Sequence, residues 1–413
     1  MTITLNDRDR ALRAGVHGPA AAFAMGLMAS FADSVGAERL IDIESGHVDG
    51  CLYLGRASLD FVERLVALGG RVAVPTTSNV GSLDLARPEA FRGSAETLRD
   101  ARRLMEAHLE LGVAPSFTCA PYQTRARPRF GAQLAWGESN AIVFANSVIG
   151  ARTERYGDFI DLCAAILGRT PEFGLHLTAN RRARLVVEIA SIPGDWSDRA
   201  LIAIAVGHIV GRLEGGPAAI VGLPADTSED DLKALGAAAA SSGAVALFHA
   251  VGLTPEAPTL EAALHGERPD RVVRIGADDL RAAALSLSTL EDGAALDALV
   301  LGTPHFSLAE FERLIGLIDG PPAAVKVYVN TGRATREALR EHRLEPALAA
   351  FGVEYILDTC AYATRVLPED VRAIMTSSGK CAYYAPGNLG VGVAFGSLAE
   401  CVASARAGRV VRL

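Results

Sequence analysis

The chain has 413 residues, of which 50% are hydrophobic and 21% are charged. This composition argues against disorder, and the length predicts two or three packed units rather than one core. Lys and Arg number 40 while Asp and Glu number 48, so the formal net charge is −8. An acidic chain lacks the basic footprint of nucleic-acid-binding proteins, and we disfavour that class.

Neither a membrane span nor a secretory signal is predicted. The apolar runs are far shorter than the about 18 residues that a span needs. The charged segment 7–10 (DRDR) lacks the basic-then-apolar order of a signal peptide. We therefore expect a cytoplasmic protein. Six Cys are too few for a disulfide scaffold in this chain, and we expect them to be thiols or metal ligands.

The first predicted elements are helices. Asn6 can cap a helix with a polar first turn, residues 19–32 are rich in Ala and Met, and residues 59–68 have helical spacing. Residues 71–75 (RVAVP) are then predicted to form a buried strand, and a polar loop over residues 76–82 follows it.

Helices alternate with short apolar runs along the rest of the chain, and many of these runs end in small polar residues. The runs are residues 114–118, 246–251, 299–301, 325–329 and 355–357. This order predicts an α/β architecture in which the carboxyl ends of the strands form a polar face. Residues 224–229 and 255–258 are the more plausible linkers.

Three cysteines have polar, turn-like surroundings: Cys119 in TCAPY, Cys360 in LDTCAY and Cys381 in SSGKCAYY. No CxxC pair is present, so spacing alone does not indicate zinc. Three thiolates that converge at strand ends could hold an iron–sulfur cluster with one iron left open. A buried Cys is otherwise a small hydrophobic residue, and we favour that interpretation for Cys163 and Cys401.

Two polar segments are candidate binding regions. Residues 76–84 (TTSNVGSLD) suit either a helix-capping loop or an anion cradle. Residues 136–147 (WGESNAIVFANS) place polar side chains on an apolar stretch, which implies an internal network or a ligand. Arg152 could hold a substrate carboxylate with two hydrogen bonds or form an ion pair with Glu154 or Asp158.

Two further residues could act on a ligand. His305 in GTPHFS suits a general base, a hydrogen-bond anchor or a satisfied structural residue. Lys380 in SSGK lacks the glycine frame of a P-loop, but its hydroxyl-rich turn could bind an anionic group.

These segments together resemble the large subunit of aconitase X, a branch of the aconitase superfamily. The resemblance is carried in order by residues 20–37, 45–50 (SGHVDG), 77–85 (TSNVGSLDL), 118–122 (TCAPY), 137–158, 302–307 (GTPHFS), 358–360 (DTC) and 377–387 (SSGKCAYYAPG). It implies an aconitase-like α/β fold of three domains, whose strands direct their carboxyl ends toward a shared central site. We place these domains at residues 1–155, 156–290 and 291–413.

Aconitase-like enzymes are hydro-lyases, and the resemblance therefore implies an enzyme with an iron–sulfur cluster. An open iron acts as a Lewis acid on the leaving hydroxyl while a base removes the proton next to a carboxylate. The resemblance implies that Cys119 and Cys360 are cluster ligands. We choose Cys381 as the third, with Cys51 as its rival, in which case the SGKC turn would contact substrate. The cluster type stays open between 2Fe-2S and 3Fe-4S or 4Fe-4S.

Together with the local patterns, the resemblance predicts the other site residues. We expect Glu138, His305 and Lys380 to be catalytic. We expect the following residues to bind substrate: Thr77, Ser78, Asn79, Ser139, Asn146, Arg152, Tyr156 and Ser378.

The family also has a small swivelling domain, fused or separate, which supplies a serine thought to be the base. The sequence ends at Leu413, shortly after the YYAPG segment, so we expect that domain to be absent from it. We therefore expect a separate small subunit to be the partner, and a small hydroxy acid to be the substrate.

Two activities are attached to the family: dehydration of cis-3-hydroxy-L-proline to pyrroline-2-carboxylate, and dehydration of mevalonate 5-phosphate. Residues 150–158 (GARTERYGD) and 45–53 (SGHVDGCLY) resemble the hydroxyproline branch, and we favour that substrate. The alternatives are a phosphomevalonate dehydratase large subunit, a non-catalytic α/β binding subunit, and a cysteine-nucleophile enzyme in which Cys119 would contact His305.

Overall fold

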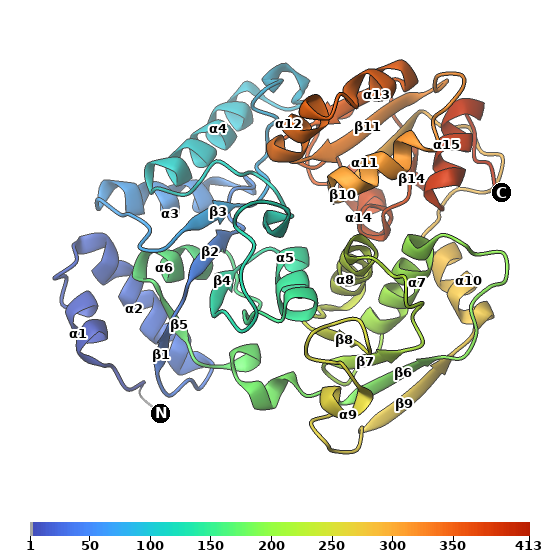
Figure 1. Cartoon of the computed structure of the whole chain (residues 1–413). Helices are drawn as coiled ribbons and strands as arrows, with labels where there is room; N and C mark the ends of the chain where they lie inside the picture. The colour runs from blue at the N-terminus through green and yellow to red at the C-terminus, as the bar shows by residue number, and fades with distance from the viewer. Residues whose placement is uncertain (1–2) are drawn as a thin grey trace. The chain divides into compact units, whose positions relative to one another are not determined.

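The computed structural model describes residues 3–413, and its elements divide into two compact units (Figure 1). Unit 1 comprises Met1–Ser82 and Gly93–Arg182, and unit 2 comprises Leu83–Arg92 and Ala183–Leu413. The short segment 83–92 therefore leaves unit 1 and packs within unit 2 before the chain returns. Among the described helices, none has both the length and the apolar character that crossing a membrane requires.

Unit 1 contains one parallel sheet and one antiparallel strand pair. The sheet has the order β3-β2-β4 and the pair is β1-β5. The strands are β1 (Leu40–Asp42), β2 (Ser45–Val48), β3 (Thr76–Ser78), β4 (Leu134–Trp136) and β5 (Arg169–Pro171). The helices are α1 (Asp7–Arg13), α2 (Pro19–Ser34), α3 (Arg56–Ala67), α4 (Ala95–Glu110), α5 (Ser139–Phe144) and α6 (Ile160–Leu167), with shorter turns η2 (Pro121–Gln123), η3 (Ala145–Ile149), η4 (Gly174–His176) and η5 (Thr178–Arg181).

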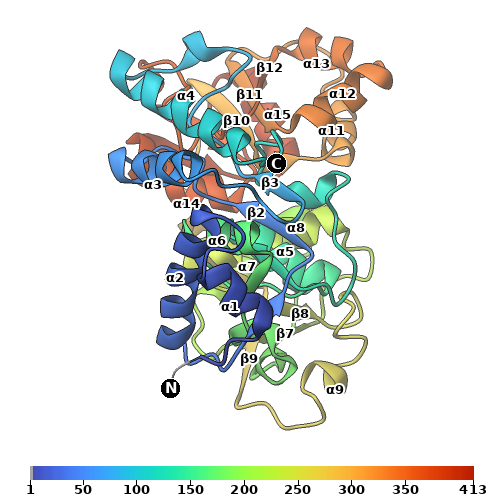
Figure 2. The same cartoon turned by 90° about the vertical axis from the view of Figure 1, so that its left-hand side faces the viewer.

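The first helices of unit 1 confirm their predictions. The Asn6 side chain accepts a hydrogen bond from the Asp9 backbone N–H, and the Asp9 carboxylate accepts one from the Asn6 backbone N–H, so both bonds of a capping box are present. The Ala- and Met-rich helix α2 packs against both α1 and α6 (Figure 2). The side chains of Ala24, Met28 and Ala32 on α2 are fully buried, and the small alanines permit close approach of the helices.

The strand predicted at residues 71–75 is wrong. The backbone N–H groups of Val72 and Ala73 donate to the carbonyls of Leu111 and Ala165, at the ends of two helices, rather than to a neighbouring strand. The strand begins instead at Thr76, and β3 pairs in parallel with β2. Residues 76–78 of the expected polar loop therefore belong to the sheet, while residues 79–82 lie outside it. Hydrogen-bond partners and not side-chain polarity decide where a strand lies.

Unit 2 contains two parallel sheets, with orders β8-β7-β6-β9 and β12-β11-β10-β13-β14. The strands are β6 (Leu185–Ile189), β7 (Ala218–Val221), β8 (Phe248–Ala250), β9 (Arg271–Ile275), β10 (Ala298–Phe306), β11 (Lys326–Thr331), β12 (Val353–Ile356), β13 (Ala373–Thr376) and β14 (Gly392–Phe395). The helices are α7 (Arg199–Gly211), α8 (Glu229–Gly243), α9 (Leu260–Ala263), α10 (Ala277–Ser286), α11 (Leu308–Ile315), α12 (Arg333–Glu341), α13 (Glu345–Phe351), α14 (Gly379–Leu389) and α15 (Leu398–Ala407), with a turn η1 (Pro88–Ala90). The predicted α/β architecture is confirmed.

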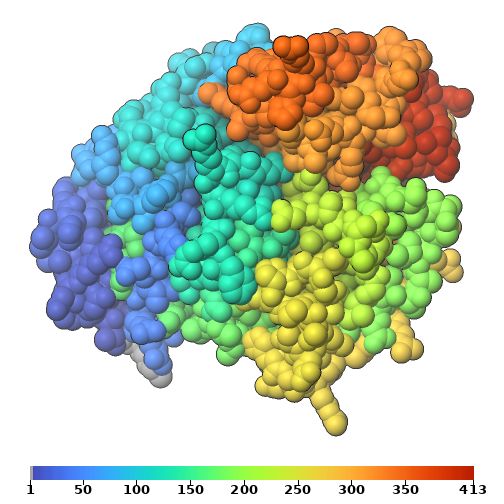
Figure 3. Space-filling model, in the orientation of Figure 1, coloured from blue at the N-terminus to red at the C-terminus, as the bar shows by residue number. Residues whose placement is uncertain are grey.

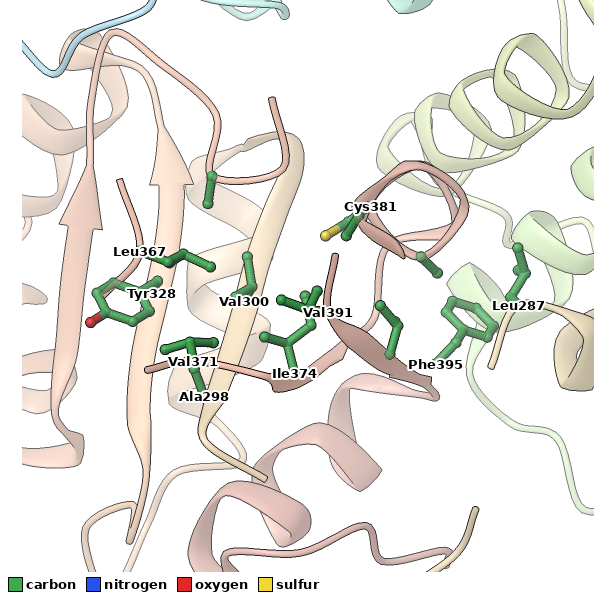
Figure 4. Close-up of a cluster of buried hydrophobic side chains, with 14 of the residues drawn as sticks. Leu287, Ala298, Val300, Tyr328, Leu367, Val371, Ile374, Cys381, Val391 and Phe395 are labelled. Atoms are coloured by element: carbon green, nitrogen blue, oxygen red, sulfur yellow. The ribbon is translucent and has the colours of Figure 1, made fainter. Parts of the chain in front are cut away.

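Both faces of the five-stranded sheet are buried. Along β10, Ala298 and Val300 enter one hydrophobic cluster, while Leu299 and Leu301 enter another on the opposite face. Figure 4 shows the first cluster, in which Val300 lies with residues from β13, β14 and α14. A parallel strand covered on both faces needs a continuous apolar run, which explains why the LVL run identified β10 from sequence.

The order of the five strands reverses between β10 and β13, because the chain builds β11 and β12 on one side and β13 and β14 on the other. Ligands in open α/β sheets bind beyond the carboxyl ends of the strands at such a reversal. The segments at this edge are the end of β10, the residues after β11 and β12, and the turn between β13 and α14. Residues 302–306 and 376–380 lie at this edge, and they are therefore candidates for ligand binding.

Candidate functional site

The carboxyl ends of β2, β3 and β4 form a polar edge in unit 1. His47 on β2 shares a 2.8 Å hydrogen bond between Nδ1 and Thr77 Oγ1 on β3. Asn79, directly after β3, donates from Nδ2 to Asp49 Oδ1, and Asp49 directly follows β2. Glu138 follows β4. Three strands thus bring these side chains together, as expected for the carboxyl ends of a parallel sheet.

Glu138 is the N-cap residue of helix α5 and contacts Ser139, which was predicted to bind substrate. Its Oε2 accepts the Ala141 backbone N–H at 2.6 Å, and its Oε1 accepts the Ser139 hydroxyl at 3.1 Å. The carboxylate therefore caps α5 while it lies almost fully buried. The next residue, Asn140, donates to the Cys119 carbonyl at 3.1 Å. Helix α5 thereby holds the loop that carries Cys119.

Several buried polar atoms at this edge have no hydrogen-bond partner among the described residues: His47 Nε2, Asn79 Oδ1 and Asn140 Oδ1. Buried polar atoms are nearly always bonded, so unbonded ones indicate a place where a ligand or water completes the site. Burial lowers the pKa of His47 to about 4. Its ring is therefore neutral near pH 7. Of the three, only Asn79 was predicted from sequence.

Cys51, the rival for the third cluster ligand, lies among carboxylates in unit 1. Burial raises the pKa of its thiol, and Asp161 and Asp49 raise it further. Burial also raises the pKa of Asp161 itself to about 8. Burial disfavours a thiolate, the form of cysteine that binds a metal, at Cys51 as it does at Cys381, so the pKa shifts do not separate the two candidates.

Hydrogen bonds inside unit 1 hold four other predicted residues: Ser78, Tyr156, Asn146 and Arg152. Ser78 donates to the Ala114 carbonyl at 2.9 Å, and Tyr156 shares a hydrogen bond between its hydroxyl and His176 Nε2. Asn146 exchanges two 3.0 Å hydrogen bonds with the Thr153 backbone.

Arg152 donates to the His176 carbonyl at 3.1 Å and to Thr178 Oγ1 at 2.7 Å. The polar residues of segment 136–147 thus take part in the internal network that was one of the two interpretations of that segment. Direct contact of these side chains with a ligand stays a prediction.

In unit 2, His305 and Cys360 lie close together at the edge of the five-stranded sheet. Both are buried, and the ligand atoms of the two side chains lie within 4.8 Å of each other. His305 Nε2 lies 3.2 Å from the Thr359 carbonyl oxygen. A carbonyl only accepts, so this bond requires a proton on Nε2 and leaves the lone pair on Nδ1. An imidazole nitrogen beside a cysteine sulfur is a donor set that suits iron or zinc.

The Cys360 loop is tied to the sheet by Asn330, a residue that the sequence analysis did not select. Asn330 at the end of β11 donates to the Leu301 carbonyl at 2.6 Å and accepts the Ala361 backbone N–H at 2.8 Å. Gly302 has φ 80, and a Cβ there would collide with the Asn330 carbonyl oxygen. Polar residues directly after a β-branched run were the only available signal for Asn330.

Ser378 and Lys380 form the first turn of α14. Ser378 Oγ accepts the Cys381 backbone N–H at 3.0 Å, which caps the helix, and donates to the Thr303 carbonyl. The Lys380 ammonium lies 5.8 Å from the centre of the Tyr362 ring, a cation–π contact. Both Ser378 and Lys380 are buried, so the predicted SSGK turn faces the interior of unit 2.

Cys381 lies in the same hydrophobic cluster as Val300 and Val391 (Figure 4). Burial raises the pKa of its thiol to about 12, and a hydrogen bond with Thr376 acts in the opposite direction. Its role as a cluster ligand stays a prediction.

Three models of known domains cover most of the chain. The model described as aconitase X first domain matches residues 2–179, the second-domain model matches residues 183–284, and the third-domain model matches residues 296–407.

Named relatives agree with these domain models. The cis-3-hydroxy-L-proline dehydratase of Hypocrea jecorina is 41% identical, over 98% of this chain and 69% of the relative. The enzyme of the same name from Pseudomonas aeruginosa is 42% identical, over 97% of this chain and 70% of the relative. The phosphomevalonate dehydratase large subunit of Methanothermobacter thermautotrophicus is 36% identical, over 94% and 95% of the two chains.

A solved structure has the same fold. The crystal structure of Thermococcus kodakaraensis aconitase X in its holo-form superposes with a TM-score of 0.87 at 29% identity, over 98% of this chain and 100% of that chain. The chain therefore spans about the whole of one group of relatives and about 70% of another.

Proposed function

Because this chain belongs to the aconitase X family and is a dehydratase, we propose that its substrate is cis-3-hydroxy-L-proline and its product pyrroline-2-carboxylate. One observation carries the choice of substrate. Identity is 41% and 42% to two enzymes named for hydroxyproline, against 29% to 36% for five named phosphomevalonate dehydratase large subunits.

The proposed cofactor is an iron–sulfur cluster held by Cys119, Cys360 and Cys381, with Cys51 as the alternative third ligand. When bound, such a cluster supplies Lewis acidity toward a leaving hydroxyl. The buried pair of His305 and Cys360 supports this cofactor, because nitrogen and sulfur donors suit iron. Cys360 alone cannot complete the coordination, so ligands from other segments are needed.

This chain's own residues would orient the substrate and move protons. Because the Nε2 proton of His305 is bonded to the Thr359 carbonyl, the lone pair of the ring lies on Nδ1. This nitrogen is therefore the one that would accept a proton or a hydrogen bond. Lys380 supplies positive charge toward the carboxylate. Glu138 accepts two hydrogen bonds that hold its carboxylate in place, and its negative charge would favour the ring ammonium.

We propose that a separate small subunit completes the enzyme. The relatives named for phosphomevalonate are large subunits by name, and this chain covers 95% of one of them. The relatives named for hydroxyproline are longer, since this chain covers only 69% and 70% of them. The additional part would supply the base, which the resemblance identifies as a serine.

The test is anaerobic co-purification of this chain with a co-expressed aconitase X small subunit. Iron and sulfide are then quantified, and turnover of cis-3-hydroxy-L-proline and mevalonate 5-phosphate is measured side by side. Turnover of hydroxyproline alone supports the proposal. Turnover of mevalonate 5-phosphate alone contradicts the substrate, and full activity without iron contradicts the cofactor.

A further inference from the structure

His47 lies on the central strand of the three-stranded sheet of unit 1, paired with Thr77 on β3 and with Trp136 on β4. Successive side chains of a strand point to opposite faces of a sheet, so Ser45 and Asp49 share the face of His47. Ser45, Asp49 and Thr77 are partly exposed. We call this side of the sheet the His47 face, and solvent reaches it at these three residues.

Helix α6 covers the opposite side of the sheet. A Cβ on Gly46 would lie 3.1 Å from the Ala165 side chain of α6, so Gly46 points toward that helix. Its neighbour His47 therefore points away from α6. In Figure 3 the teal surface at the front of unit 1 belongs to the segment that carries α5. Because Glu138, the N-cap residue of α5, directly follows the β4 end of the His47 face, this face is bordered by a surface segment.

His47 offers a hydrogen-bond acceptor on this face. Its ring is neutral near pH 7, so one nitrogen carries a proton and the other a lone pair. Nδ1 shares the 2.8 Å bond with Thr77 Oγ1, and the same hydroxyl lies 3.4 Å from the Gly46 carbonyl, which can only accept. The hydroxyl proton therefore goes to the carbonyl and Nδ1 donates to Oγ1. The lone pair is left on Nε2, which is buried and has no hydrogen-bond partner within residues 3–413.

Asn79 offers a second acceptor. Its Nδ2 donates to Asp49 Oδ1, and this bond fixes the orientation of the amide, because a carboxylate accepts from N–H and repels a carbonyl oxygen. The same bond places the Asn79 side chain on the His47 face. Its Oδ1 is buried and has no partner among the described residues. Buried acceptors without a donor cost free energy that a bound N–H group would recover.

The groups of unit 1 that act on these two acceptors are carboxylates. Burial lowers the pKa of His47, and the negative charge of Glu138 acts in the opposite direction. The Asp49 carboxylate accepts from the Asn79 amide. Acceptors beside negative charge favour a cationic N–H donor. A carboxylate or a phosphate would bring further acceptors and more negative charge, so the His47 face disfavours both.

We propose that the His47 face recognises the ring ammonium of a cyclic amino acid, with His47 Nε2 and Asn79 Oδ1 as the acceptors. A secondary ring ammonium has two N–H bonds and so supplies one donor for each acceptor. The inference rests on the proposed function and deepens it, because it assigns the ring nitrogen of the substrate to His47, a residue without a predicted role. Mevalonate 5-phosphate contains no nitrogen, so the same acceptors would select against it.

The first experiment compares two ligands of the wild-type two-subunit holoenzyme by titration calorimetry. L-Proline has the ring ammonium and the carboxylate, whereas tetrahydrofuran-2-carboxylate has the same ring size and carboxylate with an ether oxygen that cannot donate. We expect L-proline to bind at least about tenfold more tightly, because hydrogen bonds from a charged donor are strong. Equal binding of the two, or no binding of L-proline, overturns the inference, and neither result depends on a variant folding.

The second experiment tests which nitrogen of His47 matters. His47→Asn places an amide near the position of Nδ1 without reaching Nε2, and we expect it to weaken L-proline binding and raise the KM for hydroxyproline at least about tenfold. His47→Gln carries its amide to the position of Nε2, and we expect affinity within about threefold of the wild type. His108→Gln is the matched control, because His108 is also a buried histidine of unit 1, and its Nδ1 lies 2.9 Å from the Leu104 carbonyl oxygen. Iron content, measured in parallel, shows that each variant is loaded.

The outcomes separate this inference from the proposed function. If hydroxyproline is turned over but His47→Asn keeps the wild-type affinity for L-proline, the role of His47 fails while the proposed function stands. If L-proline is preferred through His47 but hydroxyproline is not turned over, the proposed substrate fails while ammonium recognition stands. A loss of L-proline binding that is equally large in His108→Gln would be a general effect of substitution in unit 1, and would overturn the role of His47.

Discussion

The two units hold the polar edges of their parallel sheets in different ways. Unit 1 builds its polar edge on strands of three or four residues, and several buried polar atoms there lack partners. Unit 2 builds its edge on a sheet whose central strand has nine buried residues, and Asn330 ties that strand to the Cys360 loop. A long, doubly covered strand can hold a site rigid by itself, whereas a short-stranded edge depends on what binds to it.

The largest expected effect comes from removing a proposed cluster ligand from either unit. Cys119→Ser and Cys360→Ser should each lower hydroxyproline turnover of the holoenzyme at least about 100-fold, because a metal ligand is lost. Iron content, measured anaerobically, should fall in parallel. Cys401→Ala is the control, since Cys401 lies in the apolar core of unit 2. If Cys119→Ser keeps its iron and its rate, unit 1 supplies no ligand through that residue.

The third ligand decides which of the two units contributes two of the three cysteines. We expect Cys381→Ala to lose at least half of the bound iron and Cys51→Ala to keep it. Both thiols are buried with raised pKa values, so the two substitutions are matched in burial. The reverse result would assign two ligands to unit 1 and one to unit 2, and would make the SGKC turn a substrate contact.

The buried ion pairs of Lys233 with Asp230 and Glu310 should contribute strongly to the free energy of unfolding of unit 2. Lys233→Met leaves Asp230 and Glu310 without their cation, and breaking a buried pair costs about 3–5 kcal/mol. We expect this loss in the free energy of unfolding measured with urea. Arg274→Met is the control, because Arg274 contacts Glu188 on the surface and such pairs contribute about 1 kcal/mol or less. Similar losses for both variants would contradict the importance of the network.

The smallest expected effect is a pH dependence in unit 1. Burial lowers the pKa of His108 to about 4, while an exposed His titrates near 6.5. The unfolded chain then binds more protons between these values, so stability should fall as the pH drops from about 6.5 to about 4. The expected slope for one such group is at most ~1.4 kcal/mol per pH unit.

The measurement compares the wild type with His108→Gln, by hydrogen exchange of unit 1 peptides at pH 7 and pH 5. The variant should lose less protection on acidification than the wild type does. The difference between the proteins is needed because the raised pKa of Asp161 acts in the opposite direction. An equal loss in both would show that His108 is not neutral and buried in solution.

Local chemistry explains which predictions from sequence are confirmed. Asn6 before a polar turn identified a capped helix, and the apolar run 299–301 identified the central strand of unit 2. In both cases the signal lies in residues that are close in the chain, although β10 itself pairs with distant strands. The strand predicted at 71–75 is wrong because its backbone groups bond to distant helix ends, which no local pattern reveals.

The sequence by itself determined the family, the alternation of helices and strands, and the positions of Cys119 and Cys360 beside the ends of apolar runs. Each of these features depends on a short, contiguous segment of the sequence. Only the tertiary structure decided that His305 lies beside Cys360, that Asn330 fastens their loop, and that His47 Nε2 is left unbonded at the polar edge of unit 1. Such contacts join residues about 30 or more positions apart, and their energy depends on burial, which packing alone creates.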